Sequence, residues 1–200
     1  MWTRPVPLSS SPLVVADMDL TPYRLPEGRF AFHITARENA ASIRKDGLQQ
    51  SAVCNSDTET IAEAFESRGY SNAFPFDRSE VVYCHLDVTY GEKHVPFDWP
   101  GNDDIVVVID LTVLSAPLYL ANMTAASEFI DHHVAPSSAP TTETFDEAVR
   151  QYRTSVVQFD GTGAVPKRMR NIDGDPELII DADVPVEAIV DIREPHRSSR

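Results

Sequence analysis

Short apolar runs bounded by turn-forming residues recur along the chain and predict a set of β-strands. The predicted strands cover residues 30–34, 80–88, 104–111, 117–120, 155–159, 177–181 and 188–192. The run DIVVVIDL at 104–111 is the strongest of these signals, and Val184-Pro185 joins the last two strands. Because the strands are spread through the chain without regular βαβ alternation, the pattern predicts an α+β fold.

Apolar residues at helical spacing predict four helices, at about 36–47, 56–69, 124–133 and 144–153. In the first helix, Thr35 is expected to cap the N-terminus, with Glu38 completing a capping box and Gly47 ending the helix. The last helix is expected to bury an apolar stripe formed by Phe145, Val149 and Tyr152.

The chain of 200 residues is long enough for one domain with a proper core, which we expect over 30–193. Residues 1–29, which are rich in Pro and Ser, are expected to form an irregular lead-in, and 194–200 a tail. No run approaches the roughly 20 apolar residues of a membrane span, and the N-terminus lacks the apolar stretch of a signal peptide. With only two cysteines, a cytoplasmic protein without membrane attachment is expected.

The charge changes this picture. The formal net charge is -14, and only Lys45, Lys93 and Lys167 are lysines among 17 basic residues. This balance suits a protein that works in high salt, where self-repulsion is screened, although a GC-rich genome also favours Arg over Lys. The charge argues against broad, non-specific binding to a phosphate backbone but allows a local groove lined with Arg.

Three residues on separate predicted strands are candidates for chemistry: His33, Tyr83 and Glu177. Each also has a structural interpretation: a buried histidine, a core tyrosine and a solvated residue at a strand end. Composition and periodicity alone therefore leave the class of protein at an α+β domain.

Three segments carry a resemblance to a known family. FHITARENAASIRKDGL at 32–48 resembles the first strand and helix of the ADP-ribosyltransferase superfamily, through His33, Thr35, Asn39, Ser42, Ile43, Gly47 and Leu48. The H-I-T form with this Asn is most similar to the DarT-like branch, which modifies DNA bases. PELIIDADVPVEAIVDI at 176–192 resembles the closing hairpin of the family, which opens with its catalytic Glu, and IVVVIDLTVLSAPLYLA at 105–121 resembles its central strands.

The resemblance implies a split antiparallel sheet core with flanking helices, and NAD+ as the substrate. It implies that Glu177 is the catalytic carboxylate, that His33 binds a ribose and that Tyr83 stacks on the nicotinamide ring. It further implies cofactor contacts from the remaining motif residues and from nearby cations, namely Ile34, Thr35, Asn39, Arg37 and Arg78. For the two arginines, a surface salt bridge is the alternative.

These residue types suit the chemistry that the family performs. Cleavage of the nicotinamide–ribose bond builds positive charge on the sugar, which a fixed carboxylate stabilises more in the transition state than in the ground state. An aromatic face is a platform for a flat, cationic ring.

The resemblance implies transfer of ADP-ribose to a macromolecular acceptor, either a protein or a nucleic acid, or simple hydrolysis of NAD+. It also allows an antitoxin or another regulatory partner, since it does not separate a toxin from a defence factor or a housekeeping enzyme. Two alternatives remain: an RNA 2′-phosphotransferase of the same fold, which the scarcity of Lys disfavours, and a non-catalytic binding module.

No metal is expected. The available nitrogen and sulfur ligands are Cys54, Cys84, His85, His94, His132 and His133. No C-x-x-C or H-x-x-x-H spacing links them, as a zinc site would require.

Overall fold

A computed structural model describes residues 29–50, 69–70, 74–78, 80–86, 104–122, 142–161 and 176–194. Several expectations lie outside these residues: most of the helix at 56–69, the helix at 124–133, the lead-in up to 28 and the tail beyond 194. The Phe145 side chain and the ligand candidates Cys54, His94, His132 and His133 also lie outside them.

Seven strands form one sheet in the order β5-β4-β6-β2-β1-β3-β7, and every pairing in it is antiparallel. Their bounds are β1 Phe30–Ala36, β2 Val82–Leu86, β3 Asp104–Asp110, β4 Leu118–Asn122, β5 Val157–Phe159, β6 Pro176–Ile180 and β7 Ile189–Arg193. Each predicted strand is present, so the strand pattern in the sequence is confirmed.

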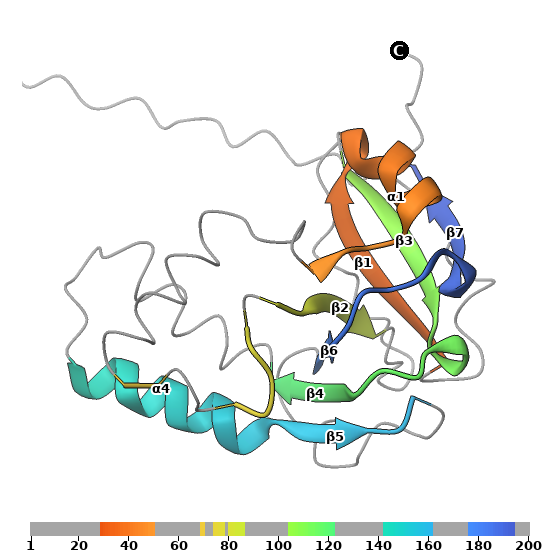
Figure 1. The fold of residues 1–200 in the computed structure, drawn as a ribbon. Helices are drawn as coiled ribbons and strands as arrows, with labels where there is room; N and C mark the ends of the chain where they lie inside the picture. The colour runs from red at the N-terminus through yellow and green to blue at the C-terminus, as the bar shows by residue number, and fades with distance from the viewer. Residues whose placement is uncertain are drawn as a thin grey trace, which may run out of the picture.

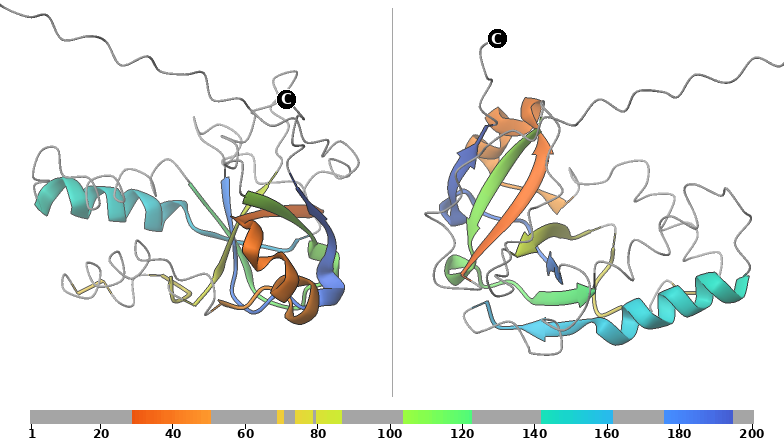
Figure 2. Two further views of the ribbon diagram at one scale, coloured as in Figure 1. Left: turned by 90° about the horizontal axis from the view of Figure 1, so that it is seen from above. Right: turned by 180° about the vertical axis from the view of Figure 1, so that it is seen from behind.

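Two α-helices accompany the sheet among the described residues: α1 at Ala40–Asp46 and α4 at Thr142–Ser155. Three 3-10 turns complete the described elements: η2 at Arg37–Asn39, η4 at Leu111–Val113 and η5 at Val186–Ala188. The predicted α+β class is confirmed. Figure 2 shows α4 leading directly into β5 at the far edge of the sheet from β7.

The sheet changes direction between β1 and β2. Only two register pairs join these strands, Ala31↔Leu86 and Phe32↔His85, whereas seven pairs join β1 to β3. Figure 1 shows β1 and β3 running at a steep angle to β4 and β5. The sheet therefore has two halves, β1-β3-β7 and β2-β6-β4-β5, that are joined over a short ladder and diverge beyond Phe32.

The alternation of side chains along each strand divides the core into clusters. One face of β2 contributes Val82, Cys84 and Leu86 to the main cluster, together with the buried residues of α1. The opposite face of β2 and β6 packs against Val149 and Tyr152 of α4. The expected burial of these two helical residues is therefore confirmed. Alternate residues of β3 pack in the main cluster and in a second cluster with Phe32, and β3 is buried along nearly its whole length.

The start of the first helix differs from the prediction. Ala36 occupies the N-cap position of η2 and makes no side-chain capping bond. Instead, the Thr35 hydroxyl oxygen accepts a 3.0 Å hydrogen bond from Nδ2 of Asn39. The expected capping box is therefore wrong, because the side chain that was to cap the backbone is engaged by the amide of Asn39.

The end of the first helix is as predicted. Gly47 adopts φ +80° and its N–H donates to the carbonyl of Ile43 at 3.0 Å. Leu48 and Val184 then exchange two backbone hydrogen bonds. This bridge fixes the chain after α1 against the segment that connects β6 to β7.

The expected closing hairpin is wrong. β6 lies between β2 and β4, while β7 lies at the sheet edge and pairs with β3. All five residues of β6 are buried, so this strand needs a neighbour on each side to satisfy its backbone. β7 is partly exposed, with Val190 at 45% accessibility, and tolerates an edge position.

Candidate functional site

Glu177 is a buried carboxylate in the centre of the sheet. Its register partners are His85 of β2 and Ala121 of β4, and only 4% of the residue is accessible. The hydroxyl of Tyr152 in α4 donates a 2.6 Å hydrogen bond to its Oε2. Because a buried carboxylate needs such donors, this bond helps to stabilise the Glu177 side chain in its position.

Tyr83 lies on the same sheet face as Glu177, one strand away. Its register partner is Ile179, two residues along β6 from Glu177. Side chains in this diagonal relationship have Cβ atoms at most about 7–8 Å apart, within reach of an aromatic ring. The Tyr83 hydroxyl donates to the carbonyl of Arg78 at 2.9 Å, which fixes the direction of the ring.

His33 lies where β1 and β2 separate. Its Nδ1 is 2.8 Å from the carbonyl oxygen of Tyr83, in the place where the next rung of the β1–β2 ladder would be. A carbonyl only accepts, so Nδ1 carries the proton and Nε2 is left as an acceptor. Burial lowers the pKa of His33, against the raising effect of this hydrogen bond, and keeps the ring neutral at neutral pH.

The three residues lie near one another across the join between the sheet halves. Phe32, His85 and Glu177 occupy one row across β1, β2 and β6. Two strand spacings of about 4.8 Å place the Cα atoms at the ends of this row about 10 Å apart. His33 follows Phe32 directly, so strand alternation turns its side chain toward the other face of β1. Its ring is nevertheless close enough to His85, the register partner of Glu177, to lower the pKa of that histidine after burial.

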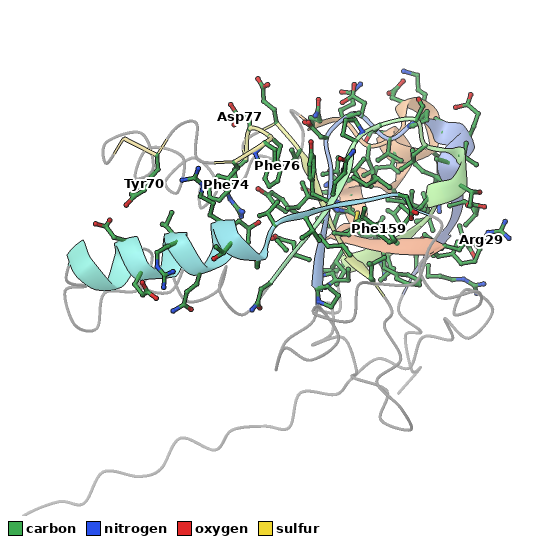
Figure 3. The ribbon with its side chains drawn as sticks, turned by 90° about the horizontal axis from the view of Figure 1, so that it is seen from below. Arg29, Tyr70, Phe74, Phe76, Asp77 and Phe159 are labelled. Carbon is green, nitrogen blue, oxygen red and sulfur yellow. The ribbon has the colours of Figure 1, made fainter. Side chains whose placement is uncertain are left out.

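Arg78 lies within an aromatic cluster beside this face. Its guanidinium carbon is 4.7 Å from the Tyr152 ring centroid, 5.0 Å from that of Tyr83 and 5.9 Å from that of Phe74. Burial opposes the charge, but the aromatic hydroxyls and the Glu177 carboxylate outweigh it, and the pKa of Arg78 is raised. Figure 3 shows Tyr70, Phe74 and Phe76 beside α4, on the side where this cluster lies.

The remaining residues of the first motif surround the end of β1. The Thr35–Asn39 hydrogen bond joins two of them, and Ile34 packs with the cluster of Phe32 and its neighbours in β3. Nη1 of Arg37 forms a 3.4 Å ion pair with Glu194. Its Nε and Nη2 are buried and have no hydrogen-bond partner among the described residues, so the guanidinium has donors in reserve.

The adjacent ligand candidates of β2 point to opposite faces. Cys84 belongs to the main core, and burial, followed by the nearby Glu177, raises its pKa. His85 is the direct register neighbour of Glu177, and burial, followed by the nearby His33, lowers its pKa. Within the described residues, no group of three side chains is arranged to hold a metal ion.

Two contributors to this face were not predicted as functional. Tyr152 was expected only as part of an apolar stripe, and His85 only as a candidate metal ligand. A signal for Tyr152 existed, since a tyrosine fully buried on a helix needs a partner for its hydroxyl. The sequence offered no sign of which group that partner would be.

Comparison with protein-family models, with curated proteins and with solved structures finds no match for this chain. Among the described helices, none combines the length and apolar character that a bilayer crossing demands.

Proposed function

We propose that the chain is an NAD+-dependent ADP-ribosyltransferase that acts on a macromolecular acceptor, either a protein or a nucleic acid. The observation that supports this function best is the linked set Glu177, Tyr83 and His33. The first two share a sheet face, and the imidazole of the third is hydrogen-bonded to the backbone of the second.

In the proposed reaction, the bond between C1′ of the ribose and the nicotinamide nitrogen breaks, and nicotinamide leaves with the bonding electron pair. The acceptor nucleophile, or water, then bonds to C1′ and loses a proton to solvent. Positive charge grows on the sugar as the bond breaks. The carboxylate of Glu177 stabilises that charge, and its fixed position means that little reorganisation is needed during the reaction.

His33 and Tyr83 have binding roles in this proposal. The unprotonated Nε2 of His33 accepts a hydrogen bond from a ribose hydroxyl, because Nδ1–H is committed to the Tyr83 carbonyl. The Tyr83 ring offers a face for the cationic nicotinamide. The guanidinium of Arg78 lies 5.0 Å from the centre of that ring, so nicotinamide uses the other face or displaces Arg78.

A net charge of -14 repels the anionic pyrophosphate of NAD+, so local donors are needed. The two buried nitrogens of Arg37 without a hydrogen-bond partner among the described residues suit that role. Arg78 suits it less, because its guanidinium already lies over three aromatic rings.

One observation favours a second candidate, a non-catalytic binding module of this fold. Glu177 is 4% accessible and already bonded to Tyr152, as a carboxylate retained for structure would be. The transferase and the binding module differ in whether the Glu177 carboxylate affects the rate of nicotinamide release or only the stability of the fold.

The test is release of nicotinamide from saturating NAD+ by the wild type, by Glu177→Gln and by the exposed-site control Glu187→Gln. Transferase chemistry predicts that Glu177→Gln loses on the order of 100-fold or more in kcat, while the control is unchanged. Labelled NAD+ with separate DNA, RNA and protein pools identifies the acceptor. Equal turnover by the wild type and Glu177→Gln, or no turnover by any protein, would favour the binding module.

A further inference from the structure

The hydrogen bond between Tyr152 and Glu177 joins α4 to β6, two elements that also pack in one cluster. Tyr152 lies in the last turns of α4 and is completely buried, and Glu177 lies in β6. Val149, one helical turn before Tyr152, packs in the same cluster as Ile179 of β6. The helix is thereby fixed against the strand, and the tyrosine hydroxyl is delivered to the carboxylate at 2.6 Å.

The direction of this bond is defined by chemistry. Burial, together with the nearby Glu177 and Tyr83, raises the pKa of Tyr152 despite the opposing effect of Arg78. The phenol is therefore protonated and donates, and the carboxylate accepts. The bond uses Oε2, so the proposed contact with a substrate hydroxyl falls to the second oxygen, Oε1.

A second set of contacts connects Tyr152 to Tyr83. The guanidinium of Arg78 lies over both tyrosine rings, and the Tyr83 hydroxyl donates to the Arg78 carbonyl. The tyrosine that holds the carboxylate is thus packed, through one arginine, against the tyrosine that lies diagonal to it on the sheet.

We propose that Tyr152 is the positioning residue of Glu177: its hydroxyl holds one carboxylate oxygen so that the other is aimed at the ribose of NAD+. This inference rests on the proposed function. A carboxylate side chain has several rotatable bonds, and preorganisation of a charged group in the reactive geometry is worth more than its mere presence. Tyr152 does not contact the substrate in this arrangement and acts only through Glu177.

The test compares Tyr152→Phe with a matched control, Tyr119→Phe. Tyr119 packs in the same aromatic cluster, but no hydrogen bond joins it to Glu177. For Tyr152→Phe, kcat for nicotinamide release is expected to fall by about 10- to 100-fold with little change in KM, since one hydrogen bond to a charged group is lost. The control is expected to keep both constants.

Two further variants separate positioning from a general loss of structure. Replacing Tyr152 by 4-aminophenylalanine returns an N–H donor to the same place and is expected to recover most of kcat. Tyr152→Phe combined with Glu177→Gln is expected to have the kcat of Glu177→Gln alone, because residues that act as a unit are not additive. Thermal melts of each variant define the temperature at which all are folded and compared.

The outcomes distinguish the two proposals. An active wild type with an equally active Tyr152→Phe, or losses that multiply in the double variant, would overturn the positioning role and leave the proposed function standing. A wild type that releases no nicotinamide would overturn both.

Discussion

Nδ1 of His33 lies 2.8 Å from the main-chain carbonyl of Tyr83, and this contact spans the point where the two halves of the sheet part. The His33 side chain thereby donates a hydrogen bond to a backbone carbonyl of β2 at a position where the backbone pairing of β1 with β2 has ended. In His33, Nδ1 therefore has a structural role, and Nε2 has the proposed role in binding.

Stability is expected to fall as the pH drops below the ordinary histidine pKa. Burial lowers the pKa of His33, and burial and His33 lower that of His85, so both bind fewer protons folded than unfolded. The free energy of unfolding then decreases as pH falls from about 6.5 toward the folded values, by at most about 1.4 kcal/mol per pH unit for each group. Denaturant titrations between about pH 7.5 and pH 5 measure this slope.

The variant His85→Gln provides the comparison, because it removes one of the two titrations and leaves the His33 contact in place. Its slope is expected to be about half that of the wild type. Asp181 opposes the effect at the acid end, since burial, followed by Asp77, raises its pKa. An identical slope in both proteins would show that His85 does not contribute.

Gly47→Ala is expected to destabilise the fold by about 2 kcal/mol or more. At φ +80° an L side chain is strained, and an added Cβ would lie 2.2 Å from the carbonyl oxygen of Val184. Gly69→Ala is the matched control: φ is also +80°, but nothing lies within 4 Å of the added Cβ. The control is expected to cost only about 1 kcal/mol. Equal losses in chemical denaturation would mean that contact with Val184 is unimportant.

Arg78→Met is expected to lower the free energy of unfolding by about 2 kcal/mol, because a desolvated cation over aromatic rings is lost while the apolar stem is kept. Coupling to Glu177 is measured by adding Glu177→Gln. If the two charges stabilise each other, the double variant is less destabilised than the sum of the single variants. Strict additivity would indicate that the arginine acts through the aromatic rings alone.

Concentrated salt is expected to stabilise the protein. A net charge of -14 with three lysines gives strong self-repulsion, which salt screens. The melting temperature should rise between about 0.1 M and about 2 M KCl. Lysine substitutions at the exposed Glu38 and Glu187 should reduce that rise. A melting temperature that stays the same or falls in concentrated KCl would contradict the expectation.

The strands were predictable because their patterns are local. In β2, Val82, Cys84 and Leu86 alternate with two more polar residues, and this period of two survives in the structure as two distinct faces. In β3, the unbroken apolar run of the sequence corresponds to burial on both faces. Neither pattern depends on which strand becomes the neighbour.

Strand pairing and the partners of side chains were harder to predict from the sequence. The final two strands are close in sequence, yet β6 pairs with β2 and β4, a choice that depends on burial of both its faces. Thr35 has the residue type of a cap, but Asn39 competes for its hydroxyl. Tyr152 shows in the sequence only that it is buried, because helical periodicity carries no information on which group a hydroxyl will meet.

The central position of β6 has a consequence for how the protein is made. β6 follows β1 to β5 in the chain, yet it lies between two of those earlier strands, so the sheet is dominated by contacts that are distant in sequence. High contact order slows folding. During synthesis, a strand can pair only after its partner strand has emerged from the ribosome. Until residues 176–180 are synthesised, β2 and β4 lack their common neighbour and Glu177 is missing from the face of Tyr83. During synthesis the site therefore stays incomplete until late, and the residue proposed to carry the chemistry arrives with the strand that joins β2 to β4.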